Sequence, residues 1–127
     1  MLMNYLESLE DYLERILMLK ERLGSVRSID IATDMGYSKP SVSIAMKKLK
    51  EKNLIEVDSK GHITLTEEGY QIAKKTYEKH ELLIKLLIYL GVSREVAEND
   101  ACKMEHSLSD ETVVKLKEFA EKISWNK

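Results

Sequence analysis

The stretch that decides the fold of this 127-residue chain is residues 28–65, SIDIATDMGYSKPSVSIAMKKLKEKNLIEVDSKGHITL. Apolar residues recur at helical spacing through its first half and alternate with polar residues near its end. Gly36 predicts a tight turn between two short helices, and Ser38 with Pro40 is typical of a helix start. Two strands joined by a polar turn at residues 58–61 are expected to follow. A helix, a turn, a helix and a hairpin in this order predict a winged helix-turn-helix.

Helices are expected on both sides of this stretch. Amphipathic spacing predicts a helix that ends at Gly24, and Thr66 followed by two glutamates predicts the start of a long one. The expected helices outside the helix-turn-helix cover residues 5–23, 67–90, 93–106 and 110–123, and the strands 54–57 and 62–66. The predicted fold is mainly α, with a winged helix-turn-helix in residues 1–75 and a helical domain in 76–127.

The composition excludes several classes of protein. The chain is 43% hydrophobic and 33% charged, which argues against disorder. It has no apolar run near the roughly 20 residues that cross a bilayer, and its start lacks the pattern of a secretory signal. Its one cysteine, Cys102, excludes a disulfide within the chain. We therefore expect a cytoplasmic protein with no membrane partner.

The charge distribution is uneven although the net charge is only −2. Residues 39–52 carry a local charge of +4, whereas residues 1–14 and 93–111 each carry −4. The basic segment suits a polyanion and the acidic segments suit cations. The alternative is that all three are ordinary solvated helix faces.

The predicted winged helix has the residues that DNA binding requires. The second helix of such a pair enters the major groove, where small hydroxyl side chains allow close approach and lysines neutralise phosphates. The alternative is a small fold that contacts other proteins. The candidate DNA-binding residues are Arg27, Ser38, Lys39, Pro40, Ser41, Ser43, Lys47, Lys48 and, on the wing, Lys60.

Side chains that bind transition metals recur at helical spacing in two predicted helices. In the helix over 93–106 a thiolate, a carboxylate and an imidazole stand at i, i+3 and i+4, and they would share one face. Two carboxylates share a face of the first helix, and one imidazole lies in the long helix. Each of these groups also has an ordinary structural explanation. A lone cysteine is usually a small buried apolar residue, and the other pairs could be solvated helix surface. The candidate ligands are Asp11, Glu14, His80, Cys102, Glu105 and His106.

An enzyme is not expected. Cys102 and His106 could suggest a cysteine nucleophile, but nothing in the sequence supplies an oxyanion hole. A phosphate-binding glycine loop is also missing from the sequence. We therefore expect neither catalysis nor a small organic substrate.

Four stretches together resemble the DtxR/MntR family of metalloregulators, the diphtheria toxin repressor and manganese transport regulator group. The resemblance covers nearly the whole chain, with the motifs in the family's order. The matching stretches are Leu9-Glu10-Asp11-Tyr12-Leu13-Glu14, Ser38-Lys39-Pro40-Ser41-Val42-Ser43, Lys79-His80-Glu81-Leu82-Leu83 and Asn99-Asp100-Ala101-Cys102-Lys103-Met104-Glu105-His106.

The resemblance implies a homodimer that binds an operator in double-stranded DNA when Fe(II) or Mn(II) is bound. The family's ligand positions fall on the six candidates above. Asp11 and Glu14 look like the manganese-responsive branch, whereas Cys102 looks like the iron-responsive branch, and its thiolate favours iron. Two positions that help form the iron branch's second site correspond to Ile84 and Glu98. Ile84 cannot be a ligand, so a full second site of the iron type is not expected. Because the sequence stops at Lys127, the SH3-like third domain of the iron branch is not expected. Ile44 stands where the iron branch tends to have a polar residue, so the operator sequence should differ.

The expected mechanism is that one cation ties the DNA-binding half to the dimer half and represses metal-homeostasis genes. The expected dimer interface is the leucine-rich stretch 83–90 together with Val113, Leu116 and Phe119. Two alternatives stay open: a metal-independent winged-helix regulator, and a metal-buffering or thiol-active protein without a DNA role.

Overall fold

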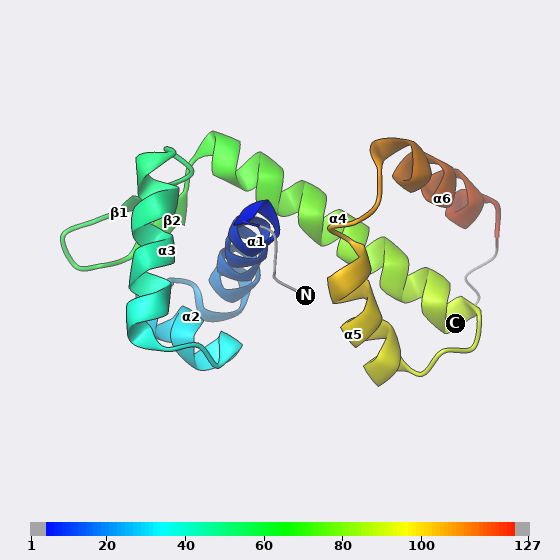
Figure 1. Ribbon diagram of the computed structural model, residues 1–127, viewed down its shortest axis with the longest axis horizontal. Helices are drawn as coiled ribbons and strands as arrows, with labels where there is room; N and C mark the ends of the chain where they lie inside the picture. Colours follow the sequence, from blue (N-terminus) through cyan, green and yellow to red (C-terminus); the bar gives the residue numbers. More distant parts are fainter. Residues whose placement is uncertain (1–4, 124–127) are drawn as a thin grey trace. The chain divides into compact units, whose positions relative to one another are not determined.

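The computed structural model describes residues 5–123, which form six helices and one two-stranded sheet (Figure 1). The elements are α1 (Tyr5–Leu23), α2 (Ser28–Met35), α3 (Lys39–Glu51), β1 (Ile55–Val57), β2 (Ile63–Leu65), α4 (Glu67–Tyr89), α5 (Arg94–Met104) and α6 (Asp110–Lys122). The mainly helical fold with a small antiparallel hairpin agrees with the prediction. None of the described helices is long and apolar enough to span a membrane.

The chain divides into two compact units within α4, the first ending at Lys75 and the second beginning at Thr76. In the first unit, α1 contacts α2, α3 and β2 around an aliphatic core. Arg15 and Arg22 of α1 both form ion pairs with Asp34 of α2, at 3.0 and 2.9 Å. The largest fully buried side chains of this core are Leu13, Ile16, Leu19, Val26, Ile31, Val42, Leu49, Ile55 and Ile63.

The wing is a short antiparallel hairpin in which Glu56 pairs with Thr64. Its second strand is tied to the loop after α1, because Ile63 N–H donates to the Val26 carbonyl at 2.7 Å. After the hairpin, the Thr66 hydroxyl accepts a hydrogen bond from Gly69 N–H at 3.1 Å and so caps α4. These contacts fix the hairpin against the helices of the first unit.

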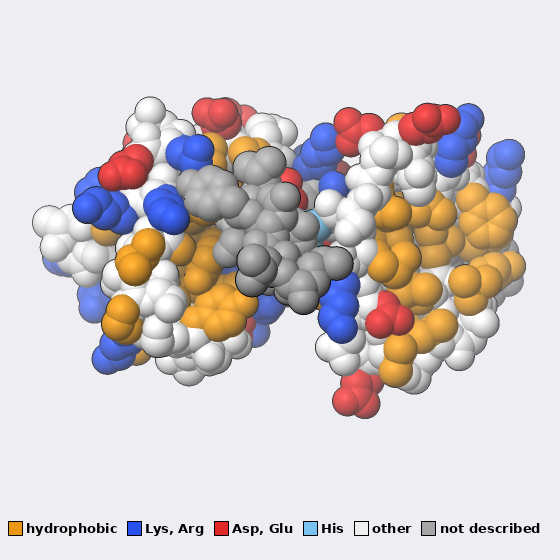
Figure 2. Space-filling view, in the orientation of Figure 1, with side chains coloured by type: hydrophobic (Ala, Val, Ile, Leu, Met, Phe, Trp, Pro, Cys, Tyr) orange, Lys and Arg blue, Asp and Glu red, His pale blue; other side chains and the backbone are white. Residues whose placement is uncertain are grey.

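The second unit has a smaller core. Leu83 and Ile84 of α4 pack against Ala97 and Ala101 of α5, with partly buried residues such as Leu116 around them. The predicted dimer stretch therefore divides in two: Leu83 and Leu116 belong to this core, whereas others are exposed. The exposed large apolar residues of this unit are Tyr89, Leu90, Val96, Met104, Val114 and Phe119. Figure 2 shows hydrophobic side chains gathered on one face of this unit.

Element ends differ from the sequence prediction at one place that matters. The helix expected over 93–106 ends at Met104, and Glu105 is its C-cap. Glu105 keeps a right-handed helical conformation and its N–H donates to the Ala101 carbonyl at 3.0 Å. The expectation that residues 102, 105 and 106 all stand on one continuous helix is therefore wrong, since His106 lies in the turn that follows.

Candidate nucleic-acid interface and metal centre

The turn between α2 and α3 has the geometry that the sequence predicts. Gly36 adopts a left-handed conformation with φ of 72°, and its N–H donates to the Ala32 carbonyl at 2.9 Å. A glycine suits this position because other residues pay a steric cost at positive φ. Ser38 then caps α3, since its hydroxyl oxygen accepts from Ser41 N–H at 3.3 Å and its O–H donates to the Ser41 hydroxyl at 2.9 Å. The two serines thus lie together at the exposed start of α3.

Every candidate DNA-binding side chain is exposed. One face of α3 is buried against the first unit by Val42, Ala45, Met46 and Leu49. The other faces of α3 carry the serines and lysines, and Figure 2 shows lysine and arginine side chains around this part of the unit. The exposed candidates are Arg27, Ser38, Lys39, Pro40, Ser41, Ser43, Lys47, Lys48 and Lys60. This arrangement leaves a hydroxyl-bearing, basic helix surface open to a duplex.

The wing tip is ordered by one carboxylate that the sequence reading had not singled out. Asp58 Oδ1 accepts hydrogen bonds from Lys60 N–H at 2.9 Å and from His62 N–H at 2.8 Å, and Asp58 Oδ2 lies 3.3 Å from His62 Nδ1. The backbone hydrogen bond from His62 is the main reason why the pKa of Asp58 is lowered. The turn composition Asp-Ser-Lys-Gly was the available signal, because aspartate commonly bonds to the backbone two residues on.

Two large hydrophobic side chains at the helix-turn-helix are exposed to solvent. Ile44 is exposed on α3, and Tyr37 is exposed in the turn before it. The Tyr37 ring meets the buried Tyr12 ring edge-on, with centroids 6.0 Å apart. Burial raises the pKa of Tyr12, so its phenol stays neutral at neutral pH.

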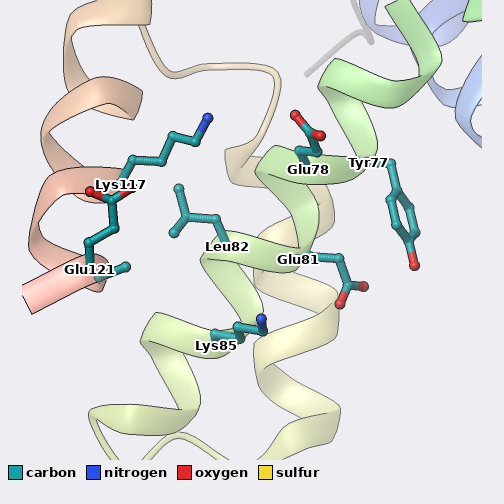
Figure 3. A pocket seen from close by; sticks show the side chains of 8 residues that line it. Tyr77, Glu78, Glu81, Leu82, Lys85, Lys117 and Glu121 are labelled. Atoms are coloured by element: carbon teal, nitrogen blue, oxygen red, sulfur yellow. The ribbon is translucent and has the colours of Figure 1, made fainter. Parts of the chain in front are cut away.

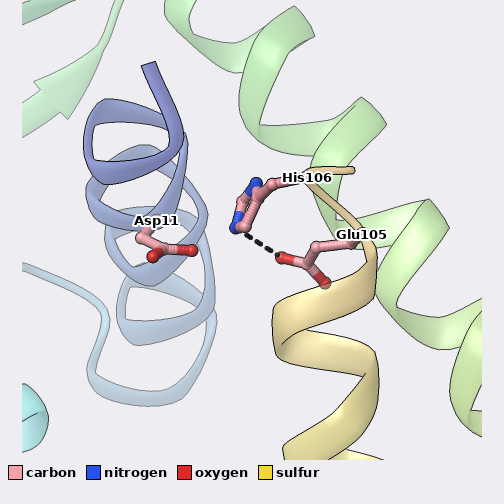
Figure 4. Close-up of side chains that lie close together, drawn as sticks. All are labelled: Asp11, Glu105 and His106. Carbon is pink, nitrogen blue, oxygen red and sulfur yellow. Dashed lines mark ion pairs between the residues drawn. The ribbon is translucent and has the colours of Figure 1, made fainter. Parts of the chain in front are cut away.

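The second unit buries a carboxylate among imidazoles. Glu105 has no exposed surface, and its Oε1 lies 2.8 Å from His80 Nδ1 of α4. Its Oε2 lies 3.4 Å from His106 Nε2, the ion pair drawn in Figure 4. Burying a carboxylate costs free energy unless partners compensate it. One carboxylate and two imidazoles at these distances are a donor set that suits a divalent transition-metal ion.

The local sequence explains how Glu105 reaches its place. Ser93 caps α5 by accepting from Val96 N–H at 3.4 Å, and the helix then presents Ala97 and Ala101 to α4. Both alanines are fully buried, and their small side chains let the two helices approach closely. Glu105 continues the same face one turn later and therefore points inward rather than to solvent.

The other candidate ligands lie on α1 and on the exposed part of α5. Asp11 and Glu14 stand three residues apart on α1, where Asp11 is half-buried and Glu14 is buried. Cys102 is exposed on α5, three residues before Glu105. The second unit thus brings His80, Glu105 and His106 together, while Cys102 belongs to a more exposed part of α5.

A separate hollow of about 450 Å³ lies between α4 and α6 in the second unit (Figure 3). Leu82 and Ala120 supply its apolar surface, and charged side chains surround them. It is lined by Tyr77, Glu78, Glu81, Leu82, Lys85, Lys117, Ala120 and Glu121. None of the six candidate ligands is among these residues, so the hollow is distinct from the Glu105 group.

Two domain models of the iron dependent repressors together cover almost the whole chain. The iron dependent repressor, N-terminal DNA binding domain, matches residues 4–63. The iron dependent repressor, metal binding and dimerisation domain, matches residues 66–126. The fold is accordingly that of an N-terminal DNA-binding domain followed by a C-terminal dimerisation domain.

Individual relatives agree with this. The transcriptional regulator MntR of Escherichia coli is 37% identical over 116 residues, 91% of this chain and 75% of the relative. A helix-turn-helix regulator of Methanocaldococcus jannaschii is 39% identical over 118 residues, 91% of this chain and 94% of the relative.

Two solved structures of similar fold match this chain over about half of their own length. The manganese regulator SloR has a TM-score of 0.79 at 33% identity, over 91% of this chain and 54% of the SloR chain. IdeR of T. acidophilum has a TM-score of 0.79 at 26% identity, over 88% of this chain and 53% of its own. The two matched domains, the MntR relatives and these structures place the chain in the DtxR/MntR family of metal-dependent transcriptional repressors.

Proposed function

We propose that this chain is an Fe(II)- or Mn(II)-activated repressor that binds an operator as a homodimer and controls metal-homeostasis genes. The observation that carries the proposal is Glu105, a carboxylate with no exposed surface that contacts His80 and His106. A fold that only needed a core would not place a carboxylate there, because apolar residues of similar volume are commonly as stable or more stable. A bound cation would compensate the free-energy cost of burying that carboxylate.

The proposed ligands come from both units. Asp11 and Glu14 belong to the DNA-binding unit, whereas the other four, His80, Cys102, Glu105 and His106, belong to the second unit. When bound, the cation would neutralise the carboxylates and tie the two units into one arrangement. If these ligands converge as proposed, Asp11, Glu14 and Glu105 would repel one another without the cation, which would favour separate movement of the units.

Iron is the favoured ion because of Cys102, since a thiolate suits Fe(II) better than Mn(II). Manganese is the second candidate for two reasons. The remaining donors are carboxylates and imidazoles, and related solved structures are described as manganese regulators. Replacing Cys102 with aspartate should shift the preference toward Mn(II).

The proposed DNA contacts come from the exposed surface of α3 and the wing. The hydroxyls of Ser38, Ser41 and Ser43 would reach phosphates and base edges, and the lysines and Arg27 would pair with phosphates. A dimer presents two copies of α3, and DNA repeats its major groove about every 34 Å. Each copy would therefore read one half of a two-fold symmetric operator.

The dimer contact is proposed on the apolar surface of the second unit. Leu90 and Phe119 are exposed members of the predicted interface, and Val114 lies beside Val113 on α6. Binding of DNA and a reduced Cys102 both suit the cytoplasm. The proposed function involves no catalysis, no membrane and no small organic substrate.

The test is an anaerobic gel shift on the DNA upstream of the chain's own reading frame, with Fe(II), Mn(II) or no metal. The wild-type protein should shift the DNA only with metal. In the double variant Glu105→Ala/His106→Ala, adding metal should no longer produce a shift. Glu95→Ala on the exposed side of α5 is the control and should behave as wild type.

The alternatives give different results. Unchanged metal dependence in the Glu105→Ala/His106→Ala variant would mean that these residues are not ligands. If wild type and both variants bound DNA equally with and without metal, a metal-independent winged-helix regulator would be favoured. Metal binding without any shift would favour a metal-buffering or thiol-active protein.

A further inference from the structure

Ile44 is an isoleucine on the surface of α3, and 58% of it is exposed. Among the described residues of the first unit it is the most exposed large hydrophobic side chain. Its neighbours Val42, Ala45 and Met46 are all buried. The core of this unit therefore does not use Ile44.

Helical spacing places Ile44 near the middle of the exposed face of α3. The buried residues Val42, Ala45, Met46 and Leu49 define one side of the helix. Pro40, Ile44, Lys47 and Glu51 follow one another at spacings of four, three and four, and all are exposed. Residues at such spacings line one face, here the face opposite the core.

The surroundings of Ile44 are basic and polar. Lys47 and Lys48 follow it by one turn, and the Ser41 and Ser43 hydroxyls precede it. A β-branched side chain at an exposed helical position adds nothing to helix stability, because such residues lose χ1 freedom there. An exposed isoleucine at this place therefore suits contact with a partner rather than folding.

We propose that Ile44 contacts the 5-methyl group of one thymine in each half of the operator. This inference rests on the proposed DNA-binding function. The lysines one turn after Ile44 suit a polyanionic partner, and the thymine methyl is the apolar group that base pairs present in the major groove. Cytosine has hydrogen at that position, so Ile44 makes this position of the operator specific for thymine.

The expected size of the effect follows from the area of one methyl group. Burying a methyl-sized apolar group changes an equilibrium constant roughly fourfold. Removing the methyl from one thymine should therefore weaken binding by wild-type protein roughly fourfold per half-site.

The experiment uses the full chain with saturating Mn(II) or Fe(II) under anaerobic conditions. A duplex is first selected from random sequences by binding, and each thymine is then replaced singly by deoxyuridine, which lacks only the 5-methyl group. Affinities are measured for wild type, Ile44→Ala and Ile29→Ala. Ile29 on α2 is the matched control, since it is an isoleucine of the same unit and 45% exposed. Melting temperatures measured by circular dichroism confirm that all three proteins are folded.

One thymine per half-site should be sensitive to deoxyuridine in the wild type and in Ile29→Ala. Ile44→Ala should bind the thymine and deoxyuridine duplexes equally. The proposal is overturned if no thymine is sensitive, or if Ile44→Ala keeps the wild-type sensitivity. Selection that recovers no duplex with either metal overturns both this proposal and the proposed function, whereas insensitivity on a recovered operator overturns only this one.

Discussion

The two units differ in what holds them together. The first unit has a continuous aliphatic core contributed by α1, α2, α3 and both strands. The second has a core built around Leu83, Ile84 and two alanines, and it buries the acidic side chain of Glu105. The second unit also leaves large apolar side chains in solvent, such as Leu90 at 73% exposure.

The two cores indicate that the stability of the units depends on partners to different degrees. A core of interlocking leucine, isoleucine and valine supplies stability without a ligand. A small core with a buried carboxylate and exposed apolar surface gains stability when a cation and a second copy of the chain are added. We therefore expect the first unit to be stable without a ligand, and the second unit to gain stability from the proposed cation and dimer partner.

Truncating the aliphatic core should have the largest effect. Leu49 is fully buried on α3, so Leu49→Ala should lower the free energy of unfolding by about 2–5 kcal/mol. Urea unfolding of the metal-free protein measures this. The control is Leu23→Ala at the exposed end of α1, which should change it by about 0.5 kcal/mol or less. Equal effects at both positions would show that the first unit lacks a specific core.

Metal should stabilise the second unit through Glu105. At a metal concentration of 100 times Kd, the wild-type protein should gain about 2.7 kcal/mol of unfolding free energy. Glu105→Gln should lose most of this gain. Glu95→Gln removes one carboxylate from the exposed side of α5 and should keep the gain. If Glu105→Gln gained as much unfolding free energy from metal as wild type, Glu105 would not be the residue through which metal stabilises the second unit.

Gly69 tests how tightly the wing is held in the first unit. A Cβ at this position would overlap the Leu54 carbonyl oxygen, so Gly69→Ala should destabilise the protein by about 1–3 kcal/mol. This is the opposite of the usual helical preference for alanine over glycine. A thermal melt measures the effect, and Glu68→Ala in the same turn should leave the melting temperature nearly unchanged. A Gly69→Ala protein that melts at a higher temperature would contradict the close approach.

The cap of α6 should contribute about 1 kcal/mol to the second unit. Ser109 accepts from Thr112 N–H and donates to the Thr112 hydroxyl, both at 3.2 Å, as Ser38 does with Ser41 in the first unit. Ser109→Ala should remove the cap, and Ser109→Asp should restore its acceptor. The urea concentrations at the unfolding midpoint compare the variants. An alanine variant as stable as the aspartate variant would show that the cap does not contribute to stability.

The wing carboxylate should have the smallest effect. The folded-state pKa of Asp58 is lowered by hydrogen bonds, chiefly from the His62 backbone. Its contribution is therefore present above the ordinary aspartate pKa of about 3.9 and is lost as pH falls through the lower folded value. The melting temperature of wild type should slightly exceed that of Asp58→Asn near pH 6, and the difference should vanish in acid. A difference that grows below pH 4 would contradict the sign.

The sequence predicted most of the architecture because its signals are local. Gly36, Ser38 and Thr66 mark element ends by side-chain and backbone chemistry, and the structure has those ends. The early end of α5 at Met104 was missed, since Glu105 itself is a good helix former. The burial of Glu105 depends on how α5 packs against α4, and residue spacing alone does not predict that packing.

The functional surfaces were predictable in part. The serines and lysines of α3 could be found because a winged helix assigns them a face, and all are exposed. The dimer stretch was harder, because Leu83 and Leu90 look alike in sequence but one is in the core and the other is in solvent. Which leucines face a neighbour depends on the packing of α5 and α6 against α4.

The central claim is that Glu105 completes the second unit only when a cation is present. Hydrogen exchange of the backbone amides, measured with and without Fe(II) or Mn(II) under anaerobic conditions, tests it most directly. We predict that metal slows exchange at residues 101–106 at least tenfold in wild type and not in Glu105→Gln, while residues 42–49 of α3 change little. Equal exchange at residues 101–106 with and without metal would contradict the account.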